Sequence, residues 1–213
     1  MIQLPSASLV AISGNISVGK STLAEILAAR WGWELFKEPE ISNPYLADYY
    51  RQPHRWGFHS QMFFLLERYK GHLKLQQQEG NALLDRSIYE DAEVFAYSIL
   101  SPRDWRTYRN YYYFSLRRLQ PPRLVVYLQA SPDVLLSRLR LRGRQYEREV
   151  TLDYLNRLNI RYDQWAGRFR RCPLLRVETD RLDVVRSGRD MEQVVMEIEE
   201  ALHRQESHSL FGP

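Results

Sequence analysis

The segment 9–22 constrains this chain more than any other, because an apolar run, a glycine-containing loop and the start of a helix follow one another there. Gly14, Gly19, Lys20 and Ser21 fit the pattern Gly-x4-Gly-Lys-Ser/Thr. Strand, loop and helix in this order are the setting that a phosphate-binding loop requires. Glycine lets the backbone approach an anion closely, and the N–H groups at a helix N-terminus attract phosphate. The segment therefore predicts binding of a nucleoside triphosphate.

The residue types within this loop predict individual roles. Lys20 is expected to reach the β- and γ-phosphates, and the Ser21 hydroxyl is expected to ligate Mg²⁺. The alternative is a turn between a strand and a helix that matches the pattern by chance, and the complete motif in its proper setting argues against it. The loop residues predicted to bind ATP are Gly14, Asn15, Ser17, Gly19, Lys20, Ser21 and Thr22.

Composition narrows the class of protein. At 213 residues, with 44% apolar and 26% charged residues, the chain suits one globular domain, taken here as 1–213. There is no 18-residue apolar run, so no membrane span is predicted. Cys172 is the only cysteine, which excludes an internal disulfide and suggests a reducing cytoplasm. The net charge of +4 is compatible with nucleic-acid binding, but arginines spread along predicted helices, with one cluster at 138–144, favour a polyanionic small molecule.

Short apolar runs alternate with segments of helical periodicity along the whole chain. This alternation predicts a parallel sheet with right-handed crossovers. The tail from residue 205 is expected to fray. The predicted strands lie near residues 9–12, 33–36, 82–84, 123–128 and 174–177, and the predicted helices near 21–31, 43–50, 53–79, 89–100, 102–119, 132–142, 151–165 and 190–202.

Charged residues follow the second and third predicted strands. Pro39 cannot continue a central strand, so Glu38 is expected at the carboxyl end of the second strand, where ligands bind in open α/β sheets. The third strand ends in Asp85-Arg86, an acid suited to Mg²⁺ and a guanidinium suited to phosphate or a carboxylate. The alternatives are a solvated loop charge at Glu38 and a structural ion pair at Asp85 and Arg86.

Further polar residues share helix faces with apolar ones. Gln61 and Arg68 lie seven residues apart on one helix, and Asp91 and Phe95 lie four apart on the helix predicted at 89–100. A polar residue on an apolar face needs a partner, although simple exposure is equally compatible with the pattern. The apolar face predicted for the first of these helices comprises Trp56, Phe63, Phe64, Leu66, Tyr69 and Leu73, and that of the helix at 151–165 includes Leu155, Leu158, Ile160, Tyr162 and Trp165. The run 111–114 predicts a buried or intersubunit face.

The helix at 132–142 carries Arg138 and Arg142 and leads into Gly143-Arg144. Such an arginine-rich segment suits a lid, at about 142–150, that closes over transferring phosphates. The alternative is a charged, solvated helix end.

Together these pieces resemble the deoxynucleoside kinase family, in its bacterial deoxyadenosine/deoxyguanosine kinase branch, over roughly residues 8 to 202. The resemblance depends on an ordered set of motifs, which is far more specific than the loop alone. They are the phosphate loop at 14–21, Glu38-Pro39, Asn43-Pro44-Tyr45-Leu46, Arg55-Trp56 with Gln61, the run from Asp85 to Asp91, and Arg142-Gly143-Arg144.

The resemblance implies an α/β fold of the P-loop NTPase type, with a five-stranded parallel sheet in the order 2-3-1-4-5, helices on both faces and an arginine-rich lid. It implies ATP with Mg²⁺ as the phosphoryl donor, a deoxynucleoside as the acceptor in nucleotide salvage, and a homodimer formed through two helices. Nucleic-acid and membrane partners are not expected.

The resemblance also implies roles for single residues. Glu38 matches the general base that takes the proton of the nucleoside 5′-hydroxyl, Arg86 the arginine beside it, and Asp85 the acid that helps to hold Mg²⁺ with Ser21. Asp85 departs from the Glu of animal relatives. The further matches are Tyr50 and Glu147 for the sugar 3′-hydroxyl, Gln61, Arg68 and Asp91 for the base, Phe95 for the base pocket, and Arg138, Arg142 and Arg144 for the donor phosphates.

Glu38 has a physical reason to be present. An alcohol acceptor has a high pKa, and a carboxylate within hydrogen-bond reach assists its deprotonation, whereas the acceptor phosphate of a nucleotide is already anionic. The sequence therefore favours a nucleoside over a nucleotide as the acceptor. The run Ile88-Tyr89-Glu90-Asp91-Ala92 resembles deoxyadenosine-type enzymes, and this resemblance implies deoxyadenosine as substrate, with deoxycytidine or deoxyguanosine accepted more weakly. The alternatives are a nucleoside monophosphate kinase of the thymidylate kinase type and a non-catalytic ATP-binding subunit.

Overall fold

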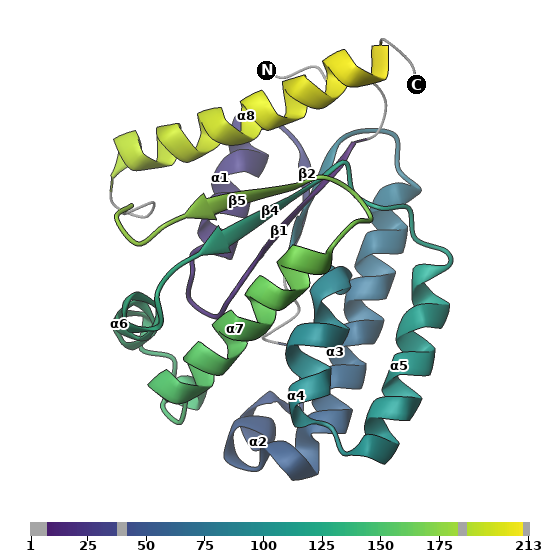
Figure 1. The fold of residues 1–213 in the computed structure, drawn as a ribbon, viewed down its shortest axis with the longest axis vertical. Coiled ribbons are helices and arrows are strands. Elements are labelled where there is room, and N and C mark those ends of the chain that lie inside the picture. Colours follow the sequence, from purple (N-terminus) through teal and green to yellow (C-terminus); the bar gives the residue numbers. More distant parts are fainter. Residues whose placement is uncertain (1–7, 38–41, 183–186, 211–213) are drawn as a thin grey trace.

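A computed structural model describes residues 8–37, 42–182 and 187–210 of the chain. Within these residues a five-stranded, all-parallel sheet has the order β2-β3-β1-β4-β5 (Figure 1). The predicted fold class and strand order are confirmed. The strands are β1 (Leu9–Gly14), β2 (Glu34–Phe36), β3 (Ala82–Asp85), β4 (Leu124–Gln129) and β5 (Leu174–Glu178).

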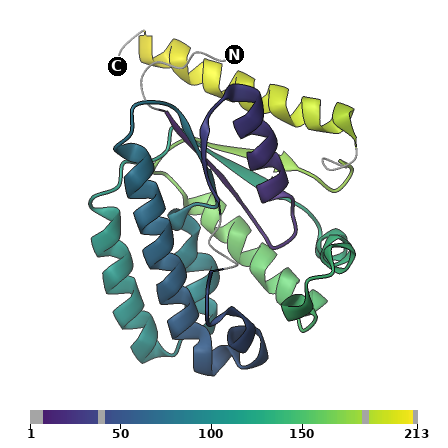
Figure 2. The same ribbon diagram turned by 180° about the vertical axis from the view of Figure 1, so that it is seen from behind.

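Helices cover both faces of the sheet, as predicted. The helices α1 and α8 lie on one face, and α3, α5 and α7 lie on the other (Figures 1 and 2). The α-helices are α1 (Lys20–Trp31), α2 (Leu46–Arg51), α3 (Pro53–Gln76), α4 (Tyr97–Ile99), α5 (Pro102–Leu116), α6 (Pro132–Arg142), α7 (Leu152–Arg168) and α8 (Gly188–Leu210).

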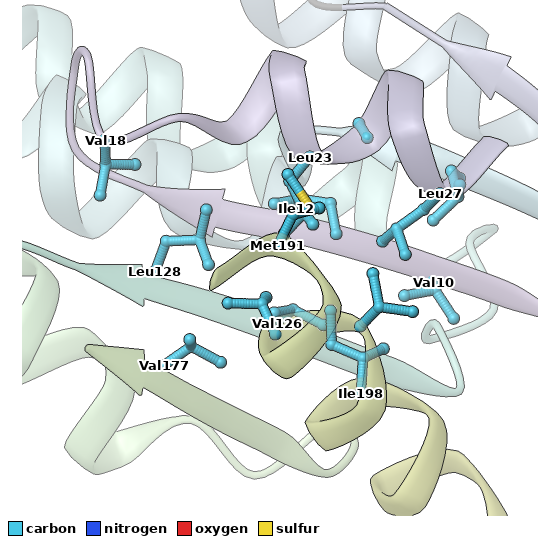
Figure 3. Packing of buried hydrophobic residues seen from close by; sticks show 14 of the residues in the cluster. Val10, Ile12, Val18, Leu23, Leu27, Val126, Leu128, Val177, Met191 and Ile198 are labelled. Carbon is cyan, nitrogen blue, oxygen red and sulfur yellow. The ribbon is translucent and has the colours of Figure 1, made fainter. Parts of the chain in front are cut away.

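Alternation of side chains along the central strands supplies both core layers, because successive residues of a strand point to opposite faces. Val10 and Ile12 of β1 pack with Leu23 of α1 and Ile198 of α8 (Figure 3). Ala11, between them, belongs to the core layer on the other side of the sheet. Burial on both faces explains why β1 and β4 read as continuous apolar runs.

The segment after β3 differs from the single α-helix predicted at 89–100. It begins with the 3₁₀ turn η1 (Ile88–Glu90), continues as the π-helix η2 (Asp91–Ala96) and ends as the short α4. The Ser87 hydroxyl accepts a hydrogen bond from the Tyr89 N–H at 2.9 Å and caps the first turn. A π-helix is rare and is frequently found at functional sites. Both Asp91 and Phe95 are buried.

The C-terminal helix is longer than predicted. It was expected to end near Leu202, with a fraying tail from residue 205, but α8 continues to Leu210. The prediction ended the helix with its last apolar periodic residues, although polar residues such as Glu206 continue a helix readily.

Some predicted apolar faces are wrong in detail. Leu66 of α3 is 49% exposed, whereas Gln61 and Arg68 are buried. On α7, Ile160 is 50% exposed. Of the run 111–114, only Tyr112 is buried, and Tyr111, Tyr113 and Phe114 are exposed in the chain. Periodicity identifies a helix but does not decide which of two mixed faces meets the rest of the protein.

Candidate active site

The phosphate loop lies where β1 meets α1, in the conformation that its glycines predicted. Gly14 has φ +142° and Gly19, at the N-cap of α1, has φ +109°. A Cβ on Gly14 would lie 2.5 Å from the carbonyl oxygen of Leu128, so only glycine fits there. Lys20 is buried, and its ammonium donates to the carbonyl of Asn15 at 2.9 Å.

Asn15 ties this loop to α7. Its side-chain amide donates to the carbonyl of Leu155 at 3.0 Å and to Oδ1 of Asn159 at 2.7 Å. Its Oδ1 accepts from the backbone N–H of Ile16 at 2.7 Å. The Asn159 amide in turn donates to the carbonyl of Ala130 at 2.7 Å. The Asn15 side chain, predicted to contact ATP, therefore holds the loop in shape.

A cleft at the carboxyl edge of the sheet brings the loop together with residues from five distant segments. Eight of its lining residues were predicted as site residues, and five were not. The predicted ones are Ser17, Lys20, Ser21, Tyr50, Gln61, Arg86, Phe95 and Arg142, and the others are Ile16, Leu46, Tyr49, Phe64 and Tyr154.

Arg86 is held from several sides at the floor of this cleft. Its backbone is left-handed, with φ +87°, and its N–H donates to the carbonyl of Ile12 at 3.0 Å. Such a conformation in a non-glycine residue is strained and persists only when the surroundings enforce it. The guanidinium lies 4.2 Å from the ring centre of Phe95 and donates to the Tyr162 hydroxyl at 2.9 Å.

Arg68 and Asp91, which were both predicted to bind the base, form a buried ion pair. Their side chains are 4% and 0% exposed. The guanidinium of Arg68 also lies 4.7 Å from the ring centre of Phe64, which lines the cleft. The pair therefore lies directly behind the cleft wall.

The predicted lid arginines lie in two different settings. Arg142, at the end of α6, pairs with the fully buried Glu147 of the 3₁₀ turn η3 (Gln145–Glu147), and Arg144 approaches the same carboxylate at 3.9 Å. Arg138 donates to the carbonyls of Thr179 at 2.6 Å and Leu182 at 3.0 Å. Closure of the segment 142–150 as a lid stays a prediction.

Ser21 and Asp85 supply the oxygen donors that were assigned to a metal. Asp85 is 3% exposed at the end of β3, beside Ile12 of β1. Mg²⁺ prefers oxygen ligands and is usually held by one or two carboxylates together with substrate phosphates, so these residues fit it. Over the described part of the chain, no group of three or more His, Cys, Asp or Glu side chains is placed to form an all-protein metal site.

Glu38, the predicted general base, lies outside the described residues. The structure thus describes Arg86, Gln61 and Phe95 of the cleft, and the role of Glu38 stays a prediction.

Glu90 was not predicted as a site residue. It is fully buried; its carboxylate accepts a short hydrogen bond from the Ser13 hydroxyl and another from the Tyr162 hydroxyl at 3.4 Å, and it pairs with Arg86 at 3.5 Å. Burial raises the pKa of Glu90 to about 7, against the opposing effect of the Arg86 charge. An acid inside a largely apolar run was the signal available in the sequence.

A phosphate loop at the end of the central strand of a parallel sheet, next to a cleft with an arginine at its floor, defines a kinase of the P-loop class. A family model described as "Deoxynucleoside kinase" matches residues 10–203. The chain belongs to the deoxynucleoside kinase family and is a phosphotransferase.

Characterised relatives agree with this family. The chain is 32% identical to the deoxyadenosine/deoxycytidine kinase of Bacillus subtilis (strain 168), over 94% of this chain and 95% of that one. It is 30% identical to the deoxyguanosine kinase of the same organism, over 92% and 99%. A structure of the deoxyadenosine kinase from M. mycoides, with dCMP and dCDP bound, is similar with a TM-score of 0.78 and 27% identity, covering 90% of this chain and 99% of that one.

No helix in the described ranges combines the length and apolar character needed to cross a bilayer.

Proposed function

We propose that this chain transfers the γ-phosphoryl group of ATP to the 5′-hydroxyl of a deoxyribonucleoside. Deoxyadenosine is the favoured acceptor, with deoxycytidine and deoxyguanosine used more weakly. One observation carries the proposal: a single cleft is lined by Lys20 and Ser21 of the phosphate loop and by Gln61 and Phe95 of the acceptor side, with Arg86 beside both.

The donor half of the reaction depends on charge. Phosphoryl transfer requires little covalent chemistry from the protein, so positioning and charge neutralisation dominate. Loop N–H groups and Lys20 bind the β- and γ-phosphates, and Arg142 faces them from the cleft wall. Mg²⁺, held by Ser21 and Asp85 together with the phosphates, neutralises the developing charge when bound. Arg138 and Arg144 complete the donor site, and the segment 142–150 closes over it.

The acceptor half requires a base and an orienting cation. Glu38 accepts the proton of the 5′-hydroxyl, and Arg86 keeps that carboxylate ionised, since an adjacent cation lowers a carboxyl pKa. Tyr50 and Glu147 bind the sugar 3′-hydroxyl. The stacking of Tyr50 on Tyr146, with ring centres 6.1 Å apart, supports a link between the sugar site and the lid segment.

Base selection is assigned to Gln61, Arg68 and Asp91, with Phe95 against the base. An amide next to an arginine–carboxylate pair offers donors and an acceptor, which suits the edge of a purine or of cytosine. The relatives named for deoxyadenosine, deoxycytidine and deoxyguanosine support this range.

The proposal includes one domain spanning 1–213, a homodimer and a cytoplasmic location. The exposed aromatic side chains of Tyr111 and Phe114, three residues apart on one face of α5, support a subunit contact, because large apolar groups that share an exposed surface often mark one. Sedimentation equilibrium measures the dimer directly.

The proposal is tested with a kcat/KM panel over the four deoxynucleosides and their monophosphates, each with ATP and Mg²⁺. We expect phosphorylation of deoxynucleosides, with deoxyadenosine first. Turnover of monophosphates alone would establish the thymidylate kinase alternative, and no turnover at all would favour a non-catalytic subunit.

Glu38→Gln tests the general base. We expect kcat to fall by roughly 10²- to 10⁴-fold, with KM for ATP nearly unchanged, because the amide cannot accept the proton. Glu67→Gln, on the surface of α3, serves as the matched control. Unchanged turnover of deoxyadenosine by Glu38→Gln would remove Glu38 from the mechanism.

A further inference from the structure

Glu90 lies behind the cleft and does not line it, yet it contacts the residue at the cleft floor. Its side chain is 0% exposed, and its Oε1 lies 3.5 Å from Nε of Arg86. A buried carboxylate is costly unless it is paired and hydrogen-bonded. Here it accepts from the Ser13 and Tyr162 hydroxyls as well, so its surroundings offset part of the cost of burying the ionised form.

Arg86 is anchored by the same group of residues. The Tyr162 hydroxyl accepts from Nη2 of Arg86 at 2.9 Å and donates to Glu90 at 3.4 Å, which joins the three side chains into one network. The Phe95 ring lies against the guanidinium at 4.2 Å. Ser13, one residue before the phosphate loop, connects this network to the donor site.

We propose that Glu90 is a positioning residue of the phosphoryl transfer, which fixes the Arg86 guanidinium at the cleft floor together with Tyr162. The inference depends on the proposed function, in which Arg86 acts at the acceptor hydroxyl. Glu90 touches neither substrate, and its effect on the reaction passes through Arg86.

The network predicts a pH response. The pKa of Glu90 is raised to about 7: burial is the main cause and the nearby Asp91 adds to it, while Arg86, Arg68 and the Ser13 hydrogen bond oppose the rise. The Tyr162 hydroxyl, whose pKa lies well above its usual value because of burial, stays protonated. Protonation of Glu90 below about pH 7 removes the charge that holds Arg86.

The test compares Glu90→Gln with the control Glu93→Gln, an exposed residue three positions further on in the adjoining π-helix η2. We expect kcat for deoxyadenosine to fall about 10- to 100-fold in Glu90→Gln, because a small displacement of a reacting group has an effect of that size, and KM for ATP to change less than twofold. As the pH is raised, kcat of the wild type should increase with an apparent pKa near 7, and this increase should be absent from Glu90→Gln. Glu93→Gln should match the wild type.

A double-mutant cycle separates positioning from a general loss of structure. In the Arg86→Met background, Glu90→Gln should change kcat less than twofold, because its effect passes through Arg86. Tyr162→Phe, which removes the 2.9 Å hydrogen bond to Arg86, should lower kcat in the same way and carries the test alone if Glu90→Gln does not fold.

Full activity in Glu90→Gln and Tyr162→Phe, with Arg86→Met impaired, would overturn this inference and leave the proposed function intact. An equal loss from Glu90→Gln with and without Arg86 would also overturn it. A wild-type enzyme without activity on any deoxynucleoside would overturn both.

Discussion

Removal of Asp91 provides a direct test of how much the buried ion pair of Arg68 and Asp91, next to the cleft, stabilises the protein. Asp91→Ala leaves the guanidinium of Arg68, whose side chain is 4% exposed, without its counter-charge. Breaking a buried ion pair in this way costs about 3–5 kcal/mol, a large fraction of the roughly 5–15 kcal/mol that stabilises a typical domain. For a chain of this length, such a loss corresponds to a fall in Tm of roughly 6–20 °C.

The measurement is equilibrium unfolding in urea, followed by tryptophan fluorescence and by circular dichroism, together with thermal melting. Glu67→Ala is the control, since the Glu67–Lys70 pair has side chains 30% and 59% exposed and its N–O distance is 2.7 Å. An exposed pair of this kind contributes about 0–1 kcal/mol. The comparison therefore isolates the effect of burial from that of losing one negative charge.

The double variant Arg68→Met, Asp91→Leu tests the physical reason. It replaces the whole pair by apolar side chains, which is often neutral, so most of the stability lost in Asp91→Ala should return. Deoxynucleoside affinity should not return, because the polar groups assigned to the base are gone. If Asp91→Ala unfolds at the same urea concentration as Glu67→Ala, the reasoning from burial is refuted.

Three further predictions concern the loop and its neighbours. Gly14→Ala should destabilise the protein by more than about 2 kcal/mol and raise KM for ATP, because the positive φ and a 2.5 Å contact with a carbonyl oxygen both disfavour a Cβ at this position. Gly80→Ala is the control in the same urea titration: it has φ +133° but no atom within 4 Å of the new Cβ, so it measures the backbone cost alone. The free energy of unfolding of the wild type should fall by up to about 3 kcal/mol between about pH 5 and 8, because the native Glu90 carboxyl keeps its proton to about pH 7 whereas the unfolded one releases it near 4.5. In Glu90→Gln this fall should be absent, and the same pH dependence of stability in both proteins would disprove the prediction. Asn159→Ala removes the 2.7 Å hydrogen bond from Asn15 to α7 and should raise KM for ATP several-fold with little change in KM for deoxyadenosine. Initial rates measured with each substrate varied test this, and an unchanged KM for ATP would contradict it.

Local chemistry made much of this protein predictable. The glycines at 14 and 19, Lys20 and Ser21 define the phosphate loop without reference to the rest of the chain, because a short loop shape depends on backbone freedom at a few positions. The alternation of apolar runs and helices predicted the parallel sheet for a similar reason, since each strand carries its own pattern of burial. Motif order then predicted the family, which the comparisons confirm.

The face that a helix presents was not predictable in the same way. On α3 the sequence offers apolar residues nearly all round, and Leu66 was expected inside, yet Gln61 and Arg68 are buried instead. The guanidinium of Arg68 can be buried because Asp91, 23 residues further along the chain, reaches it from the π-helix and compensates its charge. Such a partner depends on the packing of two segments, which the periodicity of either one does not contain.

The sequence by itself determined the phosphate loop, the alternation of strands and helices, and the residue types that a deoxynucleoside kinase requires. The tertiary structure decided that Glu90 and Tyr162 hold Arg86, that Asn159 of α7 braces Asn15, and that the segment after β3 winds as a π-helix. The physical reason is the distance along the chain over which each effect acts. Backbone preference and burial pattern depend on a few neighbouring residues, whereas a buried charge is stabilised by groups that only the folded chain brings within hydrogen-bond distance.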